Sequence, residues 1–343
     1  MSKYFVKRTL LIPIILIVSV LSVACASELP VQEDVVESVD GEQEKISASG
    51  DKYTGEFKDG IYDGKGKMEY SDGSVYDGDW KAGEWEGTGK YESSYGWSYE
   101  GEFKAGLKEG MGVYKNSGST YEGEWKNDQK SGQGVLTSTS GYSYEGEWAE
   151  DKKNGKGVYT YSNGDIYDGE FKDDKMDGSG KFSSHEGWVY EGTFTGGALT
   201  GSGKITYPSG EIYEGEVHDS QRHGTGTLTY GDGSKYEGEF ANGEFSGHGV
   251  FISAQGWVYE GEWDRNIRSG EGKLLFQDGS TYEGTWNNDE RNGNGVQTYM
   301  SNGKIVATYE GEFRDGLRHG KGTLKYADGK EQAGDWKNDN FAG

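Results

Sequence analysis

The stretch Tyr76-Asp77-Gly78-Asp79-Trp80 decides the fold, because its pattern of Tyr, acid, Gly, acid and aromatic residue recurs along most of the 343-residue chain. The alternation has the two-residue period of a β-strand. It places Tyr76, Gly78 and Trp80 on one face of the strand and both aspartates on the other. The central glycine has no side chain, so we expect a neighbouring ring to lie flat over the backbone there.

The pattern is an internal repeat with a spacing of 23 residues, apart from one spacing of 22 and one of 27 with extra residues around 304–307. Each copy has a Gly-x-Gly motif that begins eleven residues after its tyrosine. Each of the first twelve copies also has a turn glycine near its end, as in Asp72-Gly73. A degenerate thirteenth copy, residues 332–336, lacks the tyrosine. The twelve tyrosines are Tyr53, Tyr76, Tyr99, Tyr121, Tyr144, Tyr167, Tyr190, Tyr213, Tyr236, Tyr259, Tyr282 and Tyr309.

Each unit is predicted to form a β-hairpin. The Asp-Gly and Asn-Gly pairs predict two-residue turns, in which both residues need positive φ. Residues such as 81–86 are expected to loop from the core strand to a second strand that begins at Gly-x-Gly. Because one hairpin is not stable alone, we expect an all-β, elongated single-sheet solenoid of about 13 stacked hairpins, with up to about 26 strands.

The repeat explains the composition, which has 60 glycines and 47 aromatic residues but few aliphatic ones. Length alone would suggest about two globular domains, but so few aliphatic residues cannot build two ordinary cores. Collagen is excluded because the chain has 3 prolines and no triplet period. The formal charge of −24 disfavours nucleic acid and anionic membrane surfaces as partners.

Residues 1–24 resemble a lipoprotein-type signal peptide, with a basic start and an apolar stretch that is short for a stable membrane span. The sole cysteine, Cys25, follows at a lipobox-like site, which predicts lipid attachment and a tether in the cell envelope. The alternatives are secretion after cleavage at Ala26 and an uncleaved anchor. Residues 25–50 are predicted to be an acidic flexible linker, and residues 51–343 the repeat array.

The motif Tyr-Glu-Gly-Glu-Trp followed by Gly-x-Gly resembles the MORN (membrane occupation and recognition nexus) repeat over residues 53–343. The resemblance implies stacked β-hairpins, often grooved, that act in scaffolding, membrane association or protein contact without enzymatic activity. Some members carry a lipid-kinase domain after the repeats; this sequence ends within a repeat, so that activity is not expected. The departures from the pattern are Thr193, Val217, Thr285 and Gln332.

Several residue patterns could carry chemistry. The paired carboxylates of the core motif could serve a glycosidase or a Ca²⁺ site. Repetition in nearly every unit favours a framework role instead, with the following lysines as partners: Lys58, Lys81, Lys104, Lys126 and Lys337. The Gly-x-Gly motifs lack the context of nucleotide loops, and the five histidines lack zinc-ligand spacing. We therefore expect no enzyme activity, no cofactor and no metal site.

One less uniform feature is an aromatic residue two positions before some core tyrosines, at Trp97, Tyr142, Trp188 and Trp257. These residues could form a strip at the edge of a groove, suited to peptide side chains or sugar rings. Local packing at the hairpin end is the simpler interpretation. The leading hypothesis is a non-enzymatic scaffold that binds a protein of neutral or basic character; a glycan-binding module is the alternative.

Overall fold

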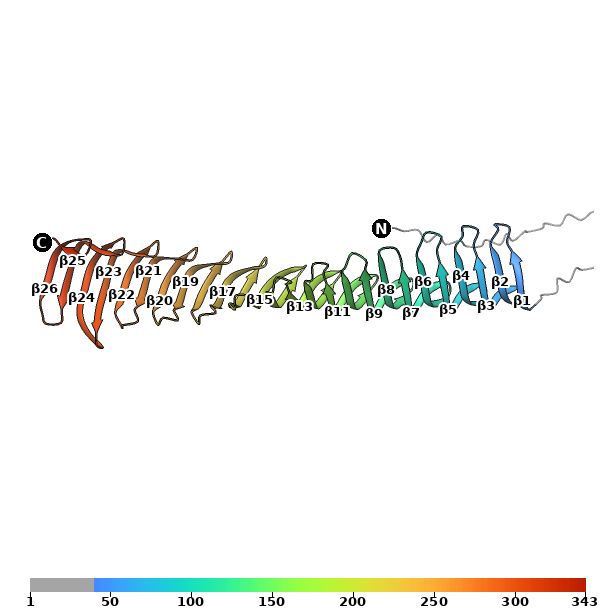
Figure 1. The fold of residues 1–343 in the computed structure, drawn as a ribbon, viewed down its shortest axis with the longest axis horizontal. Coiled ribbons are helices and arrows are strands. Elements are labelled where there is room, and N and C mark those ends of the chain that lie inside the picture. Colours follow the sequence, from blue (N-terminus) through green and yellow to red (C-terminus); the bar gives the residue numbers. More distant parts are fainter. Residues whose placement is uncertain (1–39) are drawn as a thin grey trace, which may run out of the picture. The chain divides into compact units, whose positions relative to one another are not determined.

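The computed structural model describes residues 40–343, which form one open antiparallel sheet of 27 strands in chain order (Figure 1). Within this range there is no helix, and so none that could span a membrane. The strands are β1 (Gly41–Ile46), β2 (Lys52–Lys58), β3 (Ile61–Glu69), β4 (Val75–Lys81), β5 (Glu84–Glu92), β6 (Ser98–Lys104), β7 (Leu107–Lys115), β8 (Ser119–Lys126), β9 (Gln129–Ser138), β10 (Ser143–Ala149), β11 (Lys152–Thr160), β12 (Ile166–Lys172), β13 (Lys175–Ser183), β14 (Val189–Thr195), β15 (Ala198–Thr206), β16 (Ile212–His218), β17 (Gln221–Thr229), β18 (Lys235–Ala241), β19 (Glu244–Ile252), β20 (Val258–Asp264), β21 (Ile267–Leu275), β22 (Thr281–Asn287), β23 (Glu290–Ser301), β24 (Lys304–Arg314), β25 (Leu317–Tyr326), β26 (Glu331–Lys337) and β27 (Asn340–Phe341).

The predicted all-β solenoid of hairpins is confirmed. Each even-numbered strand from β2 to β26 carries the core motif, and the odd-numbered strand after it carries the rest of the unit. In the hairpin β10–β11, Tyr144 lies opposite Tyr159 and Gly146 opposite Gly157, after which the register shifts by a bulge before Trp148. Because each strand pairs with its neighbours in sequence, every unit contacts the units beside it.

The core is a row of tyrosines on one face of the sheet, called here the inner face; the opposite, carboxylate-bearing face is the outer face. All twelve core tyrosines are at most 1% exposed, although the sheet has a single layer. The ring of Tyr144 lies over the backbone of Gly146 and Gly157, where an added Cβ would come within 2.7 and 2.5 Å of its hydroxyl oxygen. The hydroxyl donates a hydrogen bond to the carbonyl of Glu147 at 2.9 Å. The predicted packing of a ring on glycine is confirmed.

The two hairpin turns of each unit differ from the sequence prediction. The Asp-Gly pairs near the ends of the units, such as Asp72-Gly73, lie in three-residue turns. Gly73 N–H bonds to Tyr70 C=O, Tyr70 N–H bonds to Ser74 C=O, and only the glycine has positive φ. The two-residue turns lie at the other end of the unit, as in Ala82-Gly83, where both residues have positive φ. The expected 81–86 loop was therefore wrong, because β5 begins directly after this turn at Glu84.

The hairpin β23–β24 is longer than the others and contains the insertion around residue 304. The extra residues extend both strands to a two-residue turn at Asn302-Gly303, so the tip projects beyond its neighbours (Figure 1). Ile305 and Val306 at this tip are exposed.

The ordered array begins before residue 51. Residues 41–46, inside the predicted linker, form β1 and pair with β2, and the Asp40 carboxylate accepts a hydrogen bond from the Asp59 N–H. The predicted signal peptide, Cys25 and residues 26–39 of the predicted linker lie outside the described residues.

Candidate functional site

The inner face carries one variable position that covers each buried tyrosine, nine residues after it in the same unit. We call the residue there the lid. The ring of Tyr62 stacks on Tyr53 at 4.0 Å, and that of Phe245 on Tyr236 at 3.6 Å. The lids are Tyr62, Trp85, Lys108, Lys130, Lys153, Met176, Leu199, Arg222, Phe245, Arg268, Arg291 and Arg318. Sequence reasoning missed this row, although its fixed distance from the tyrosine was a usable signal.

The cationic lids lie over aromatic rings. Lys108 Nζ is 4.1 Å from the ring centre of Trp125, and the Arg268 guanidinium is 4.4 Å from that of Trp286. Cation–π attraction and the apolar side-chain stems explain why Lys or Arg can replace a ring here. Burial lowers the pKa of Lys108, because its side chain is desolvated where it covers the core.

Three of the seven cationic lids, Lys153, Arg268 and Arg318, form an ion pair with an aspartate in the turn of the following unit. The Arg268 Nε lies 3.0 Å from Asp289, and the Arg318 Nε 2.9 Å from Asp339. The same turn position holds aspartate after Lys108, Lys130 and Lys153, where the carboxylate accepts a hydrogen bond from the backbone N–H of the lid. It holds no acid after any uncharged lid. After the remaining two cationic lids, Arg222 and Arg291, the turn position holds a glycine. The carbonyl of that glycine accepts a hydrogen bond from the guanidinium of the lid. Five of the seven cationic lids therefore have an aspartate at this turn position, and three of them form an ion pair with it.

The four sequence-predicted site residues lie at hairpin ends on the inner face, half buried against other rings. Trp97 lies between Tyr91 and Tyr114, with ring centres 4.9 and 5.6 Å away. Trp188 stacks on Phe182, Trp257 on Phe251 and Tyr142 on Tyr159, at 5.1, 5.1 and 5.9 Å. The residues do not contact one another; each belongs to its own group of rings.

Each of these rings has a serine opposite it across the three-residue turn. The Ser184 N–H donates to the Trp188 carbonyl, and Ser93 and Trp97 are paired in the same way. In other units the arrangement is reversed, as at Tyr70 and Ser74. Ten of the twelve hairpin ends carry one ring in the two positions that flank the turn. The exceptions are the shortened turn between Asn116 and Ser119 and the extended hairpin β23–β24, where Tyr299 faces Ala307 within the strands. This regularity supports the local-packing interpretation of the four residues.

The second carboxylate of the core motif has a structural role in most units. The Glu147 carboxylate accepts a hydrogen bond from the Lys156 N–H at 3.0 Å and lies against Gly155, where φ is +64°. Seven other units have the same bond between the carboxylate and the residue nine positions later, at 2.8 to 3.1 Å. This bond satisfies a backbone donor at the bulge. The expected framework role is confirmed, but no ion pair among residues 40–343 joins a carboxylate to the five lysines predicted as its partners.

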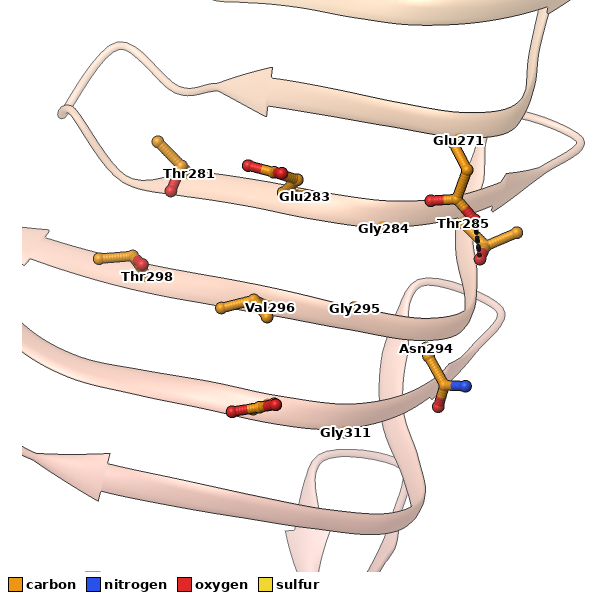
Figure 2. A pocket seen from close by; sticks show the side chains of 11 residues that line it. Glu271, Thr281, Glu283, Gly284, Thr285, Asn294, Gly295, Val296, Thr298 and Gly311 are labelled. Atoms are coloured by element: carbon orange, nitrogen blue, oxygen red, sulfur yellow. Dashed lines mark hydrogen bonds between the residues drawn. The ribbon is translucent and has the colours of Figure 1, made fainter.

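The first carboxylate of the motif lies on the outer face and is exposed. In some units it pairs with a lysine across the strands, as Glu191 does with Lys181 at 2.9 Å. An open hollow of about 760 Å³ lies on this face. Among its lining residues, Glu283 and Val296 project from adjacent strands, and Thr285 donates a hydrogen bond to Glu271 (Figure 2). Thr285 replaces the second carboxylate of its unit and is one of the departures noted in the sequence.

The described residues contain no group of three or more His, Cys, Asp or Glu side chains placed to hold a metal ion. His185 is paired with Asp165 through Nδ1 at 2.7 Å. Hydrogen bonds from the backbone and ring of His185 hold the pKa of Asp165 down, at about 2. In the core, burial raises the pKa of Tyr53 and Tyr167 to about 12.

Comparison with solved structures finds chains whose overall similarity to this protein is low. The TCP10 domain of Danio rerio CPAP, in complex with a peptide of STIL, is 11% identical, with 70% of this chain and 96% of that chain covered and a TM-score of 0.32. The Drosophila melanogaster SAS-4 TCP domain, in complex with a proline-rich motif of Ana2, is 12% identical, with 47% and 85% covered and a TM-score of 0.29. No curated protein matches the chain.

The family comparison is specific. The model of the MORN repeat matches twelve consecutive stretches between residues 53 and 331, each beginning at a core tyrosine. These stretches coincide with the twelve hairpins that bury a tyrosine on the inner face. The chain therefore belongs to the MORN repeat family.

Proposed function

We propose that the array is a non-enzymatic scaffold that binds a protein segment along its inner face. The supporting observation is the combination of a constant tyrosine core with two variable rows, the lids and the hairpin-end rings, on one continuous face. Repeat proteins bind in this way when a fixed framework presents a different side chain from each unit.

The chemistry of this face favours an extended partner that is apolar and neutral or basic. Half-buried rings such as Trp97 and Trp188 offer apolar contact with little conformational entropy to lose. Cationic lids such as Arg268 and Arg318 already have acidic partners, so they attract an anionic ligand weakly. The formal charge of −24 gives a further preference for basic partners.

The test is photo-crosslinking in intact cells. A photoreactive residue replaces either Leu199, on the inner face, or Val296, on the outer face, and the captured protein is identified. Capture from Leu199 and not from Val296 is expected. Equal capture from both faces, or none from Leu199, contradicts binding at the inner face.

A pull-down with substituted rings tests the role of the four predicted residues. The triple variant Trp97→Ala, Trp188→Ala and Trp257→Ala is compared with Tyr95→Ala, which removes an 86% exposed ring from a turn tip. Loss of the captured partner in the triple variant alone is expected. Retention of the partner would remove these residues from the binding surface. Binding to purified polysaccharide in place of protein would support the glycan-binding alternative, which is weakened by the coverage of one face of Trp188 and Trp257 by neighbouring rings.

We further propose that a lipid on Cys25 tethers the array in the cell envelope. The support is the sequence of residues 1–25, with its basic start, apolar stretch and small residues. Radiolabelled fatty acid is expected to label the wild type and not the Cys25→Ser variant. Equal labelling of both proteins, or of neither, would refute the lipid anchor.

A further inference from the structure

The two edges of the described sheet carry complementary halves of a repeat unit. Positions are counted from the core tyrosine of a unit, taken as position 0. Gly41 of β1 lies opposite Phe57 as Gly64 lies opposite Trp80, so Gly41 occupies position 11 and β1 begins the second strand of a unit. At the other edge, β26 contains positions 0 to 4, residues 332–336, and is the first strand of a unit.

Inner-face residues at the two edges depart from the repeat in matching ways. Position 13 is glycine in all twelve complete units because the tyrosine at position 0 lies on it; an added Cβ at Gly157 would meet the Tyr144 ring at 2.5 to 2.7 Å. In β1 this position is Gln43, and in β26 position 0 is Gln332. If the two strands paired in the regular register, the missing ring of one would make room for the added side chain of the other.

The outer-face residues match in the same way. Positions 1 and 14 lie opposite each other within a unit, as Glu145 and Val158 do. Position 1 is acidic in eleven of twelve units, and position 14 is Lys, Val or Thr in all twelve. At the two edges the acidic residue is at the opposite position: position 1 is Ala333 in β26, and position 14 is Glu44 in β1. Regular pairing would therefore place no like charges opposite each other at positions 1 and 14.

We propose that β1 of one copy of this chain pairs antiparallel with β26 of a second copy, which completes a repeat unit and joins the sheets head to tail. The register places Gln332 opposite Lys45, Ala333 opposite Glu44 and Gly334 opposite Gln43. Within the described residues, the edge of β26 is covered by β27 only at Trp336 and Lys337, and Asp335 exchanges hydrogen bonds with Ala342 and Gly343. Ala342 and Gly343 occupy the positions that the incoming Asp40 and Gly41 need, so they leave the edge when the second copy docks. This contact is independent of the inner-face binding proposed above.

The alternative is that both edges are polar only to keep a monomer soluble, as in terminal repeats of other arrays. Disulfide trapping separates the two possibilities. Two differently tagged full-length chains are co-expressed in cells, one with Glu44→Cys and the other with Ala333→Cys, and intact cells are oxidised. Residues opposite each other in an antiparallel pair lie about 4.5–5.5 Å apart between Cα atoms, within disulfide reach.

A crosslink between the two tags is expected. The matched control replaces Ala333→Cys with Glu310→Cys, which holds the same position 1 inside the sheet, where its neighbouring strands are already paired. Equal crosslinking with the control, crosslinks only between identical tags, or no crosslink would overturn the proposal. Because Cys25 is present in every chain, its contribution is the same in the test and the control.

A compensating pair of substitutions tests the register. Gln332→Tyr restores the family motif but places a ring against Gln43 of the neighbouring copy, so crosslinking is expected to fall at least about fivefold. Addition of Gln43→Gly to both chains is expected to restore it. If Gln332→Tyr leaves crosslinking unchanged, or if Gln43→Gly does not rescue it, the proposed register is wrong.

Discussion

At the scale of single residues, one tyrosine and two glycines form the basic element of stability. The Tyr144 ring is enclosed edge-on by Trp148 and by Phe171 of the next unit, both 5.1 Å away between ring centres. Gly146 and Gly157 let the ring approach the backbone so closely that the hydroxyl reaches a carbonyl beyond them. A single-layer sheet can therefore bury twelve large side chains without a second layer.

Gly157→Ala is expected to destabilise the protein by about 1–3 kcal/mol, because the new Cβ would overlap the Tyr144 ring and backbone prevents its retreat. Urea unfolding and hydrogen exchange of the β10 and β11 amides are the measurements. Gly118→Ala is the matched control, since its nearest neighbour would be 3.6 Å away. Similar losses for both variants would contradict the role of the close ring contact.

A second residue-scale prediction concerns Ala82, which has a φ of 48° in a two-residue turn. A left-handed conformation is unfavourable for alanine, and asparagine occupies the equivalent position at Asn127 and Asn242. Ala82→Asn is expected to stabilise the protein by about 1 kcal/mol in urea unfolding. Ala149→Asn, outside the positive-φ region, should give no such gain; an equal gain there would point to a different cause.

At the scale of the hairpin, the two ends of each unit are stabilised differently. One end is a tight turn that contacts the unit before it and, after five of the cationic lids, places an aspartate beside the lid. The other end is a wider turn that packs one aromatic ring over the facing position. The ring can belong to either strand: Tyr70 precedes its turn, whereas Trp97 follows its turn. This is possible because the two positions that flank the turn lie on the same face and face each other.

This exchange predicts a rescue. Trp188→Ser is expected to cost about 1–2 kcal/mol, since it removes the ring stacked on Phe182. Adding Ser184→Tyr, which copies the arrangement at Tyr70 and Ser74, is expected to recover most of the loss. The urea unfolding of the single and double variants measures this. If the double variant is no more stable than Trp188→Ser alone, the two positions are not interchangeable.

At the scale of the whole molecule, contacts run from each unit to the next. The strands pair in chain order from β1 to β27, and core tyrosines contact rings of their own and the following unit. Stability in such an array is close to a sum of unit and interface contributions, so its length can change without loss of the fold.

Removal of one complete unit tests this additivity. Deletion of residues 167–189, which span one 23-residue period, joins Ile166 to Tyr190 and preserves the alternation of faces. The shortened chain is expected to keep its β-sheet circular dichroism. Deletion of 168–189, one residue fewer, shifts every later side chain by one position and should disrupt the fold at the junction. Equivalent spectra and unfolding curves for both deletions would argue against a strict register.

The core also predicts how the molecule responds to alkali. Burial raises the pKa of Tyr53, Tyr167, Tyr213 and Tyr309 from the ordinary value of 10 to about 12. The folded state binds these protons more tightly than the unfolded state. The resulting stability is therefore complete below about pH 10 and is lost as the pH rises towards about 12.

Tyrosinate absorbance and circular dichroism should follow this loss together. Of the 25 tyrosines, at least the twelve of the core are expected to ionise late, in step with unfolding. A single titration of all tyrosines near pH 10 with the sheet intact would contradict the burial.

The sequence by itself determined the period, the number of units, the strand faces and the glycine beneath each ring. These follow from local patterns that are repeated often enough to leave one interpretation. It did not determine which turn is tight, because Asp-Gly fits both a two-residue turn and a three-residue turn ending in glycine. The tertiary structure decided what covers each tyrosine, which backbone donor Glu147 and its equivalents satisfy, and that residues 41–46 belong to the sheet. Those features depend on neighbouring strands, such as the lid that returns nine residues later or the aspartate of the following unit, and pairing between strands is a property of the assembled sheet.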